Sequence, residues 1–571
     1  MLMIIGYICK YTPVKLLESM SIECVRIEPS YIDNGITEAH MHPNVCTYVK
    51  GVLTEVFKGG YDGIILVNCC DSVRRLYDVL KNAENGKMIY MLDLPRKSGD
   101  QSVAMYASEI KKLIQTFTDF YGKKFNVQDF IRYISTEQEN AGQFNMPKGN
   151  DGIRLAIMGA RCNSSLIDLL KKAGADEVLN YTCTGDLLNY MPLPDFSAGE
   201  QDIIEWYAGS LIRSIPCMRM ADIDRRRDML KDIMANVNGI VYHTIKFCEF
   251  YSYEYSYIKD NCRFPILKIE TDFTQGSEGQ LITRIGAFVE SLKGSNNKVE
   301  RPSHGTRKTI VAGIDSGSLS TDVVILDEDY NILSYSIVPT GASIVDSANK
   351  AFSQSLKRAG ITPQDVSFIV STGYGRINIP FANKQVTEIT CHGKGAYFLN
   401  SNIRTIIDIG GQDSKVIRLD EDGNVVDFVM NDRCSAGTGR FLEVMAKALE
   451  IPLEKMGEEA EKATEDINIT SICTVFAESE VISLIAQNKK RADIIKGLHN
   501  SVASKTIGLL DRLGRKGAYM MTGGVAKNRG VVEAIEQRIG DKVHIPAEPQ
   551  LVGALGAAIL ALQEIKVKHV K

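Results

Sequence analysis

Apolar positions in the first half of the chain form short runs, and longer stretches with apolar residues at every third or fourth position separate them. The short runs predict strands and the longer stretches predict helices. This alternation is typical of parallel α/β units, in which each strand is followed by a helix. The predicted strands are residues 4–8, 63–68, 87–92, 153–158, 177–182, 239–245 and 264–271.

The same pattern divides residues 1–293 into two lobes, about 1–98 and 152–293, with a mainly helical segment at 99–151 between them. We expect two Rossmann-like lobes. The apolar start, Met1–Gly6, has no basic leader, so it predicts a first strand and not a signal peptide. Residues 294–308 are polar, small and aperiodic, which predicts a linker.

Three strand-and-turn motifs follow the linker. One strand ends at Asp315 and a Ser/Gly turn, a second ends at Asp408 and a Gly-Gly turn, and a third precedes Gly523-Gly524. Turns of Gly, Ser and Thr can wrap phosphates with backbone N–H groups and hydroxyls. In this order they predict a duplicated ATPase core of the acetate-kinase, sugar-kinase, Hsp70 and actin type at 309–567, and the sequence contains no Walker P-loop motif.

The nucleotide chemistry is assigned to the residues of these motifs. Asp315 could hold hydrated Mg²⁺, and Asp408 or Gln412 could orient metal and water, so these three are the candidate catalytic residues. Leu551–Ala558 predicts a small-residue helix for close packing. The candidate ATP-binding residues are Gly313, Asp315, Ser316, Gly317, Ser318, Ser320, Thr321, Asp408, Gly410, Gly411, Gln412, Gly523, Gly524 and Lys527.

Cysteines recur at one topological position in the first half. Ligands of open α/β sheets bind at the carboxyl edge of the strands, so cysteines there could converge between the lobes. Each one, taken alone, can also be a structural thiol. The candidates just past a predicted strand are Cys9, Cys69, Cys70, Cys183 and Cys248, and Cys46 lies in a loop or helix start.

Cys434 and Cys473 each precede a helical pattern in the second half. A helix start favours a thiolate or an anionic cluster. Two thiols are too few for a four-thiolate site, but a twofold dimer would bring four, enough for one [4Fe-4S] cluster. Two unrelated cytosolic thiols are the alternative, and these cysteines alone leave both open.

Composition narrows the class of protein. A chain of 571 residues predicts two to four domains. Its net charge of −4 does not indicate a protein that binds nucleic acid. No apolar run approaches the length of a membrane span. Thirteen scattered cysteines do not form a disulfide framework, so we expect a cytoplasmic protein with metal-binding or catalytic thiols.

Residues from about 309 to 565 resemble the 2-hydroxyacyl-CoA dehydratase activators, the BadF/BadG/BcrA/BcrD ATPase family. The resemblance implies a homodimer through this domain, with one [4Fe-4S] cluster held by Cys434 and Cys473 of both subunits. It also implies that ATP and Mg²⁺ drive one low-potential electron onto a partner iron–sulfur protein, with a donor such as ferredoxin or flavodoxin. The motifs that carry it are residues 313–318, 408–415, 431–441, 473–483 and 522–526.

Residues 1 to about 293 resemble the dehydratase D-component. The matching segments are 6–13, Cys46, 68–71, 246–248 and 269–284. The resemblance implies a [4Fe-4S] cluster on three cysteines, best assigned to Cys46, Cys69 or Cys70, and Cys248. The additional Cys9, Cys183 and the Cys69-Cys70 pair are similar to the double-cubane branch of the family, so both cluster types stay open.

Only one dehydratase-like half is present, whereas dehydratases use two different halves. A separate dehydratase subunit is therefore a candidate partner, and 2-hydroxyacyl-CoA dehydration and small-molecule reduction both stay open. The preferred hypothesis is ATP-dependent low-potential electron transfer from the C-terminal to the N-terminal domain. The alternatives are a sugar- or acetate-type kinase with a ligand-binding N-terminal domain and no cluster, and a non-enzymatic metabolite sensor.

Overall fold

The chain folds into two compact units, Met1–Ile285 and Gly286–Lys571. The computed structural model describes residues 3–83, 86–140, 152–185, 199–214, 217–221, 223–261, 264–272, 278–293, 309–431, 436–469 and 474–570. The boundary between the units falls inside helix α11 (Glu278–Lys293). The predicted linker, 294–308, lies outside the described residues, as does the end of the predicted helical segment at 141–151.

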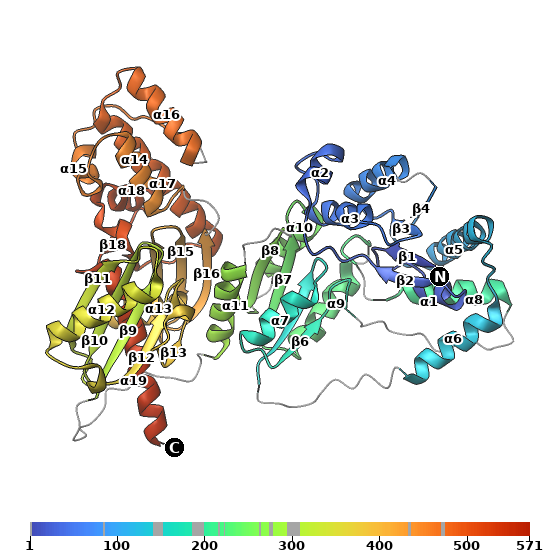
Figure 1. Ribbon diagram of the computed structural model, residues 1–571, viewed down its shortest axis with the longest axis horizontal. Coiled ribbons are helices and arrows are strands. Elements are labelled where there is room, and N and C mark those ends of the chain that lie inside the picture. The colour runs from blue at the N-terminus through green and yellow to red at the C-terminus, as the bar shows by residue number, and fades with distance from the viewer. Residues whose placement is uncertain are drawn as a thin grey trace. The chain divides into compact units, whose positions relative to one another are not determined.

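Two four-stranded parallel sheets form the first unit (Figure 1). The first has the order β2-β1-β3-β4 and the second the order β6-β5-β7-β8, and every neighbouring pair is parallel. The predicted Rossmann-like α/β lobes are thereby confirmed. The strands are β1 (Ile4–Tyr7), β2 (Glu23–Arg26), β3 (Gly63–Val67), β4 (Met88–Leu92), β5 (Arg154–Gly159), β6 (Glu177–Asn180), β7 (Gly239–Ile245) and β8 (Ile266–Thr271).

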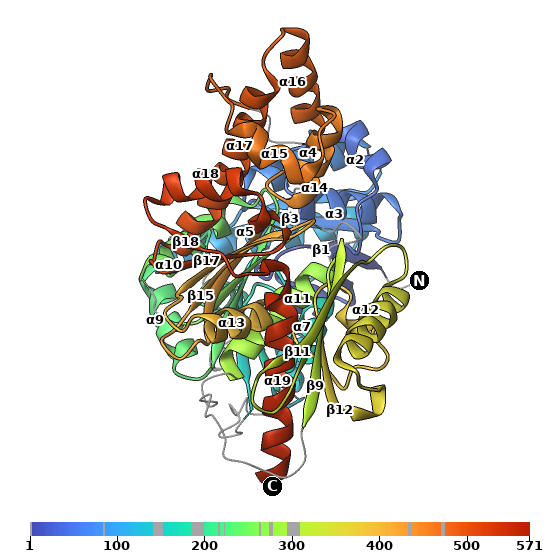
Figure 2. The ribbon, with the colours of Figure 1, turned by 90° about the vertical axis from the view of Figure 1, so that its left-hand side faces the viewer.

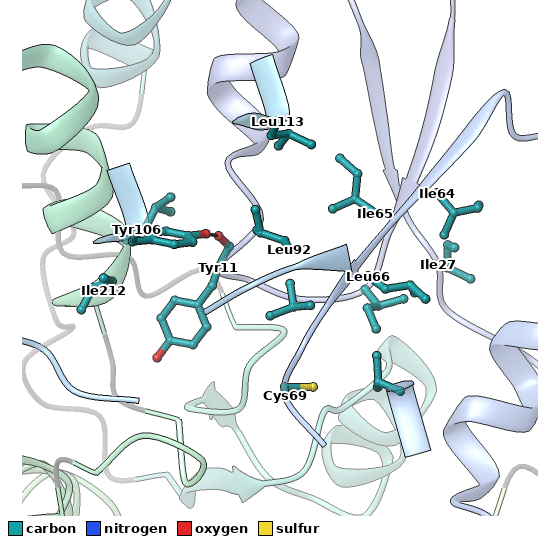
Figure 3. Packing of buried hydrophobic residues seen from close by; sticks show 14 of the residues in the cluster. Tyr11, Ile27, Ile64, Ile65, Leu66, Cys69, Leu92, Tyr106, Leu113 and Ile212 are labelled. Carbon is teal, nitrogen blue, oxygen red and sulfur yellow. Dashed lines mark hydrogen bonds between the residues drawn. The ribbon is translucent and has the colours of Figure 1, made fainter. Parts of the chain in front are cut away.

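Helices cover both sheets of this unit, and a single buried cluster runs through the two lobes. Tyr106 of α5 donates a hydrogen bond to the Tyr11 carbonyl oxygen, which ties the helical segment to the loop after β1. Figure 3 shows this packing around Ile64–Leu66 of β3, with Cys69 beside it. The helices are α1 (Val14–Ser19), α2 (Asn34–His40), α3 (Thr47–Phe57), α4 (Asp71–Ala83), α5 (Asp100–Tyr121), α6 (Val127–Asn140), α7 (Ser164–Lys172), α8 (Glu200–Ile212), α9 (Ile223–Met234), α10 (Glu249–Asn261) and α11.

The second unit contains the same sheet twice. One sheet has the order β11-β10-β9-β12-β13 and the other β16-β15-β14-β17-β18, each with three antiparallel strands followed by two parallel ones. The predicted duplicated ATPase core is thus confirmed. The strands are β9 (Ile310–Ser316), β10 (Ser320–Leu326), β11 (Ile332–Pro339), β12 (Val366–Thr372), β13 (Lys384–Gln385), β14 (Thr405–Ile409), β15 (Ser414–Leu419), β16 (Val425–Asn431), β17 (Tyr519–Thr522) and β18 (Val543–His544).

Two helices pack very closely at the centre of this unit: α13 (Glu388–Leu399) and α19 (Val552–Val570), with α19 also against β9 and β12 (Figure 2). A Cβ atom on Gly556 would lie 1.8 Å from the Cys391 carbonyl oxygen, so only glycine fits there. The predicted close-packing helix is confirmed. The remaining helices are α12 (Ile344–Ala359), α14 (Gly439–Ala448), α15 (Met456–Ala460), α16 (Thr474–Ala486), α17 (Arg491–Leu513) and α18 (Arg529–Ile539). Across the described ranges, none of the helices is long and apolar enough to cross a membrane.

Candidate functional sites

Seven cysteines line one cavity of about 70 Å³ in the first unit. Six of them are the cysteines that the sequence had singled out, and the structure brings all six together. Parallel strands place their carboxyl ends at one edge, which explains why thiols from different strands meet. The seven are Cys9 after β1, Cys46 before α3, Cys69 and Cys70 after β3, Cys183 after β6, Cys217 after α8 and Cys248 after β7.

Cys217 is the thiol that sequence reasoning missed. It lies in the loop after α8, where no strand ends, so the topological rule does not mark it. Its backbone N–H donates to the Tyr11 hydroxyl at 3.1 Å, and its Sγ lies 3.5 Å from the Tyr251 hydroxyl. Tyr11 follows β1 and Tyr251 belongs to α10, so tyrosines from both lobes hold this loop at the cavity.

Cationic side chains accompany the thiols. Arg219 Nη1 donates to Cys69 Sγ at 3.6 Å. Buried Nε atoms of Arg219 and Arg161 have no hydrogen-bond partner among the described residues. Lys10 and Arg96 also line the cavity, and its described lining contains no carboxylate. Because a buried positive charge needs compensation, this lining suits an anionic occupant such as a thiolate-bound cluster.

The thiols differ in acidity. Burial raises the pKa of Cys9 to about 11 and that of Cys46 to about 12. A hydrogen bond from Cys69 lowers the pKa of Cys70 to about 6. Cys9 and Cys46 therefore keep their protons at neutral pH until a metal displaces them, which is the usual linkage of thiolate ligation.

The arrangement of the thiols distinguishes between kinds of metal centre. In the described part of the chain, no three His, Cys, Asp or Glu side chains converge closely enough for one metal ion. The cysteines instead surround a cavity, and this spacing suits a cluster of several irons better than a single tetrahedral ion. The residues present thus fit an iron–sulfur cluster.

A carboxylate and histidine group lies at the centre of the second unit. Asp315 on β9 and Asp408 on β14 occupy equivalent places in the two sheets, each beside a threonine of the next parallel strand, Thr372 or Thr522. His392 of α13 lies between them, with Nε2 3.9 Å from Asp315 Oδ2 and Nδ1 3.7 Å from Asp408 Oδ1. Thr522 donates to Asp408 Oδ1 at 2.8 Å.

The two aspartates differ in charge environment. Lys415 lies opposite Asp408 on β15, with Nζ 3.3 Å from Asp408, 2.9 Å from Asp413 and 3.1 Å from Glu388. Although burial opposes ionisation, His392 and Lys415 lower the pKa of Asp408. Burial raises the pKa of Asp315 to about 7. Asp408 is therefore ionised at neutral pH, and Asp315 exchanges its proton near neutrality.

The three predicted glycine turns surround this pair. Gly317 donates its N–H to Ser320 O at 2.9 Å, and Gly410 donates to Asp413 O at 3.0 Å. A Cβ on Gly411 would lie 2.4 Å from the Leu319 side chain, so the first two turns touch. Gly523 has a φ of +82°, and a Cβ there would lie 2.9 Å from Asp408 Oδ1. The structure thus places Asp315, Asp408 and all three turns together.

Other predicted nucleotide residues serve the fold or lie at its surface. Gly313 admits α19, because a Cβ there would lie 2.0 Å from Ala554 O. The buried Thr321 hydroxyl bonds to the Thr340 and Ser347 hydroxyls. Lys527 pairs with Glu548 at 2.8 Å. The Ser316 hydroxyl is buried with no partner among the described residues, Ser318 is half-buried, and Gln412 and Gly524 are exposed.

Cys434 and Cys473 lie outside the described residues, but both neighbouring helices are described. Helix α14 begins shortly after Cys434, and its Gly439 and Arg440 N–H groups donate to Gly410 O and Gly411 O at 2.9 and 2.8 Å. Helix α16 begins directly after Cys473. The first turn of α14 therefore contacts the glycine turn beside Asp408.

His392 is the second residue of the candidate sites that no sequence pattern singles out. It is buried, but both of its ring nitrogens face carboxylates. No spacing along the chain signals this position, because α13 comes from between the two sheets in sequence.

Comparison with known proteins settles the family. The BadF/BadG/BcrA/BcrD ATPase family matches residues 312–561. The activator of lactoyl-CoA dehydratase from Anaerotignum propionicum is 49% identical over 256 residues, which cover 45% of this chain and 98% of that protein. The chain belongs to the BadF/BadG/BcrA/BcrD ATPase family. The resemblance of its C-terminal half to these ATPases is confirmed.

The N-terminal half of this ATPase matches a second family, the D-component of 2-hydroxyglutaryl-CoA dehydratase, over residues 9–146 and 136–292. That resemblance is also confirmed. The (R)-2-hydroxyglutaryl-CoA dehydratase activating ATPase of Acidaminococcus fermentans is 44% identical over 44% of this chain and 96% of its own length. A solved activator of the 2-hydroxyisocaproyl-CoA dehydratase from Clostridium difficile aligns with a TM-score of 0.45 and 41% identity, covering 46% of this chain and 97% of that one.

Proposed function

We propose that this chain couples ATP hydrolysis in its C-terminal unit to low-potential electron transfer into its N-terminal unit. The observation that carries the proposal is the cavity lined by seven cysteines in the same chain as an activator-type ATPase. A fused donor and acceptor meet within one molecule, which raises their effective concentration.

The ATPase chemistry rests on the paired aspartates. Asp315 and Asp408 would hold hydrated Mg²⁺, and the exposed Gln412 would orient the attacking water. The turns at 316–320 and 410–411 offer N–H groups and hydroxyls to phosphates, and Gly523-Gly524 leaves room for adenosine. His392 would keep the two carboxylates in register through its two ring nitrogens.

Two groups of cysteines would hold iron–sulfur clusters. Cys434 and Cys473 from two copies of the chain would hold a shared [4Fe-4S] cluster. Helix α16 supports a dimer there, because Val475 and Phe476, two and three residues after Cys473, are each 67% exposed and a partner copy would cover them. Thiols drawn from the seven cysteines of the N-terminal cavity, Cys217 included, would hold one [4Fe-4S] cluster or a double cubane. Such clusters, when bound, supply one-electron reduction.

The relatives' names support a CoA thioester as the substrate, since they are activators of lactoyl-CoA and 2-hydroxyglutaryl-CoA dehydratases. The reaction would be 2-hydroxyacyl-CoA dehydration, with a separate dehydratase subunit as partner, or reduction of a small molecule by the N-terminal unit alone. A ferredoxin or flavodoxin would supply the electrons.

Iron and acid-labile sulfide per chain, measured on protein purified without oxygen, test this proposal. A cluster shared by two chains gives about two irons per chain, and the N-terminal site adds about four for a cubane or eight for a double cubane. Cys434→Ser should remove the first two irons and leave ATP binding intact, whereas Cys69→Ser should lower only the remainder. A wild-type value of two would refute the N-terminal cluster. No iron, together with a phosphorylated product, would establish the kinase alternative.

A further inference from the structure

The end of helix α11 packs inside the ATPase unit. The D-component match extends to residue 292, so α11 belongs to the dehydratase-like segment, whereas the ATPase match begins only at residue 312. The last turns of α11, from Gly286 onward, nevertheless lie in the second unit. Ala287 is fully buried in one cluster with Ile389 and Ala396 of α13.

Glu290 of α11 caps the N-terminus of α13. Its carboxylate accepts hydrogen bonds from the Thr387 N–H at 3.1 Å and from the Thr387 and Thr390 hydroxyls at 2.5 Å each. Thr387 is the N-cap residue of α13, and its own side chain makes no capping hydrogen bond. A carboxylate is favoured at this end of a helix, since it satisfies free N–H groups and faces the positive end of the dipole.

Helix α13 also carries two residues of the nucleotide site. Glu388 forms an ion pair with Lys415, and Lys415 forms a second ion pair with Asp408. His392 lies between Asp315 and Asp408. Glu388 is the first residue of the helix and His392 the fifth, so about one helical turn, roughly 6 Å, separates the capped end from the histidine. A displacement of the capped end therefore displaces His392.

We propose that Glu290 is a positioning residue for the ATPase site, and that α11 links the position of α13 to the dehydratase-like segment. Any movement of α13 on nucleotide binding would displace the Glu290 carboxylate through its hydrogen bonds to Thr387 and Thr390, and would therefore displace the end of α11. In the opposite direction, a change in α11 would alter the distances from His392 to the two aspartates. The inference rests on the proposed nucleotide site at Asp315 and Asp408.

Full-length Glu290→Ala, Glu290→Gln and Lys293→Ala test this role. Lys293 is exposed on the last turn of the same helix, so its variant is the matched control. We expect Glu290→Ala to lower kcat for ATP hydrolysis about tenfold with KM within twofold, because a misplaced group slows the chemical step. Glu290→Gln keeps an acceptor oxygen and should restore most of kcat. A purely structural role would leave kcat unchanged in the folded fraction.

Hydrogen exchange with and without ATP separates this inference from the proposed ATP site. In the wild type, ATP should slow exchange both in the first turn of α13 and in the last turns of α11, and in Glu290→Ala only the α13 response should remain. If ATP leaves hydrogen exchange in α13 of the wild type unchanged, the nucleotide site and this inference are both overturned. If α13 responds but α11 does not, or if Glu290→Ala behaves as the wild type, only the link through Glu290 is overturned.

Discussion

Lys415 should be the most consequential single charge in the ATPase unit. Its side chain is 4% exposed, and its ammonium nitrogen lies within 3.3 Å of carboxylate oxygens from Asp408, Asp413 and Glu388. Lys415→Met removes the cation and keeps most of the volume, so three carboxylates lose their common partner. Breaking a buried pair in this way typically costs about 3–5 kcal/mol of unfolding free energy. We expect a loss in that range at pH 8.

The loss should shrink at lower pH. In the wild type, the lowered pKa of Asp408 contributes stability that is present above its unfolded pKa and lost as pH falls through the folded pKa. Without Lys415 the folded pKa of Asp408 rises. The variant then gains protons in the folded state on acidification, and its deficit at pH 5 should be smaller than at pH 8.

Urea unfolding in the absence of Mg²⁺ measures both effects. The only tryptophan, Trp206, lies in the first unit, so its fluorescence follows that unit, whereas circular dichroism follows both. Lys415→Met should shift a circular-dichroism transition and leave the Trp206 transition in place. Lys462→Met is the control, because Lys462 is 69% exposed in its pair with Glu459 and should change stability by less than about 0.5 kcal/mol. A deficit below about 1 kcal/mol at pH 8, or one that grows at pH 5, would refute the reasoning.

Three further substitutions probe the other contacts. Cys217→Ser should lower the iron content of anaerobically purified protein. The same substitution should lower it by the same amount in a Cys434→Ser background, because the two proposed iron sites are separate. Unchanged iron would exclude Cys217 as a ligand. Gly556→Ala places a Cβ 1.8 Å from Cys391 O and should lower the thermal midpoint of the ATPase unit or prevent its folding, whereas Gly508→Ala, with open space, should not. Asp408→Asn should reduce kcat for ATP hydrolysis by about 100-fold or more in a steady-state assay, with ATP affinity in a binding titration changed far less.

Most strand positions of the first unit and the thiols at the strand ends could be predicted because both follow from local patterns. Apolar runs ending at Cys9, Cys69 and Cys248 placed thiols at the carboxyl edge of a parallel sheet, and the structure gathers them there. Cys217 could not be assigned to this cavity from the sequence, because its loop follows a helix. Tertiary hydrogen bonds to Tyr11 and Tyr251 hold that loop at the cavity. Periodicity carries no signal for such contacts.

The predicted nucleotide residues also show that local sequence patterns do not reveal contacts between distant parts of the chain. Gly313 looked like part of a phosphate turn, yet its missing side chain admits α19 against β9. No sequence motif includes His392, yet its ring nitrogens lie 3.9 Å from Asp315 and 3.7 Å from Asp408. In each case the decisive neighbour is far away in sequence, so spacing within a motif cannot distinguish a packing role from a chemical one.

The duplication explains how one fold produces two aspartates of opposite character. Asp315 pairs with Asp322 across β9 and β10, and Asp408 pairs with Lys415 at the equivalent position across β14 and β15. Burial acts on both carboxylates, but Asp322 adds to the raised pKa of Asp315, whereas Lys415 helps to lower the pKa of Asp408. Pairs of carboxylates whose environments push their pKa values apart divide acid and base roles between them. The aspartate in one repeat and the lysine at the equivalent place in the other thus contribute to the opposite pKa shifts of Asp315 and Asp408.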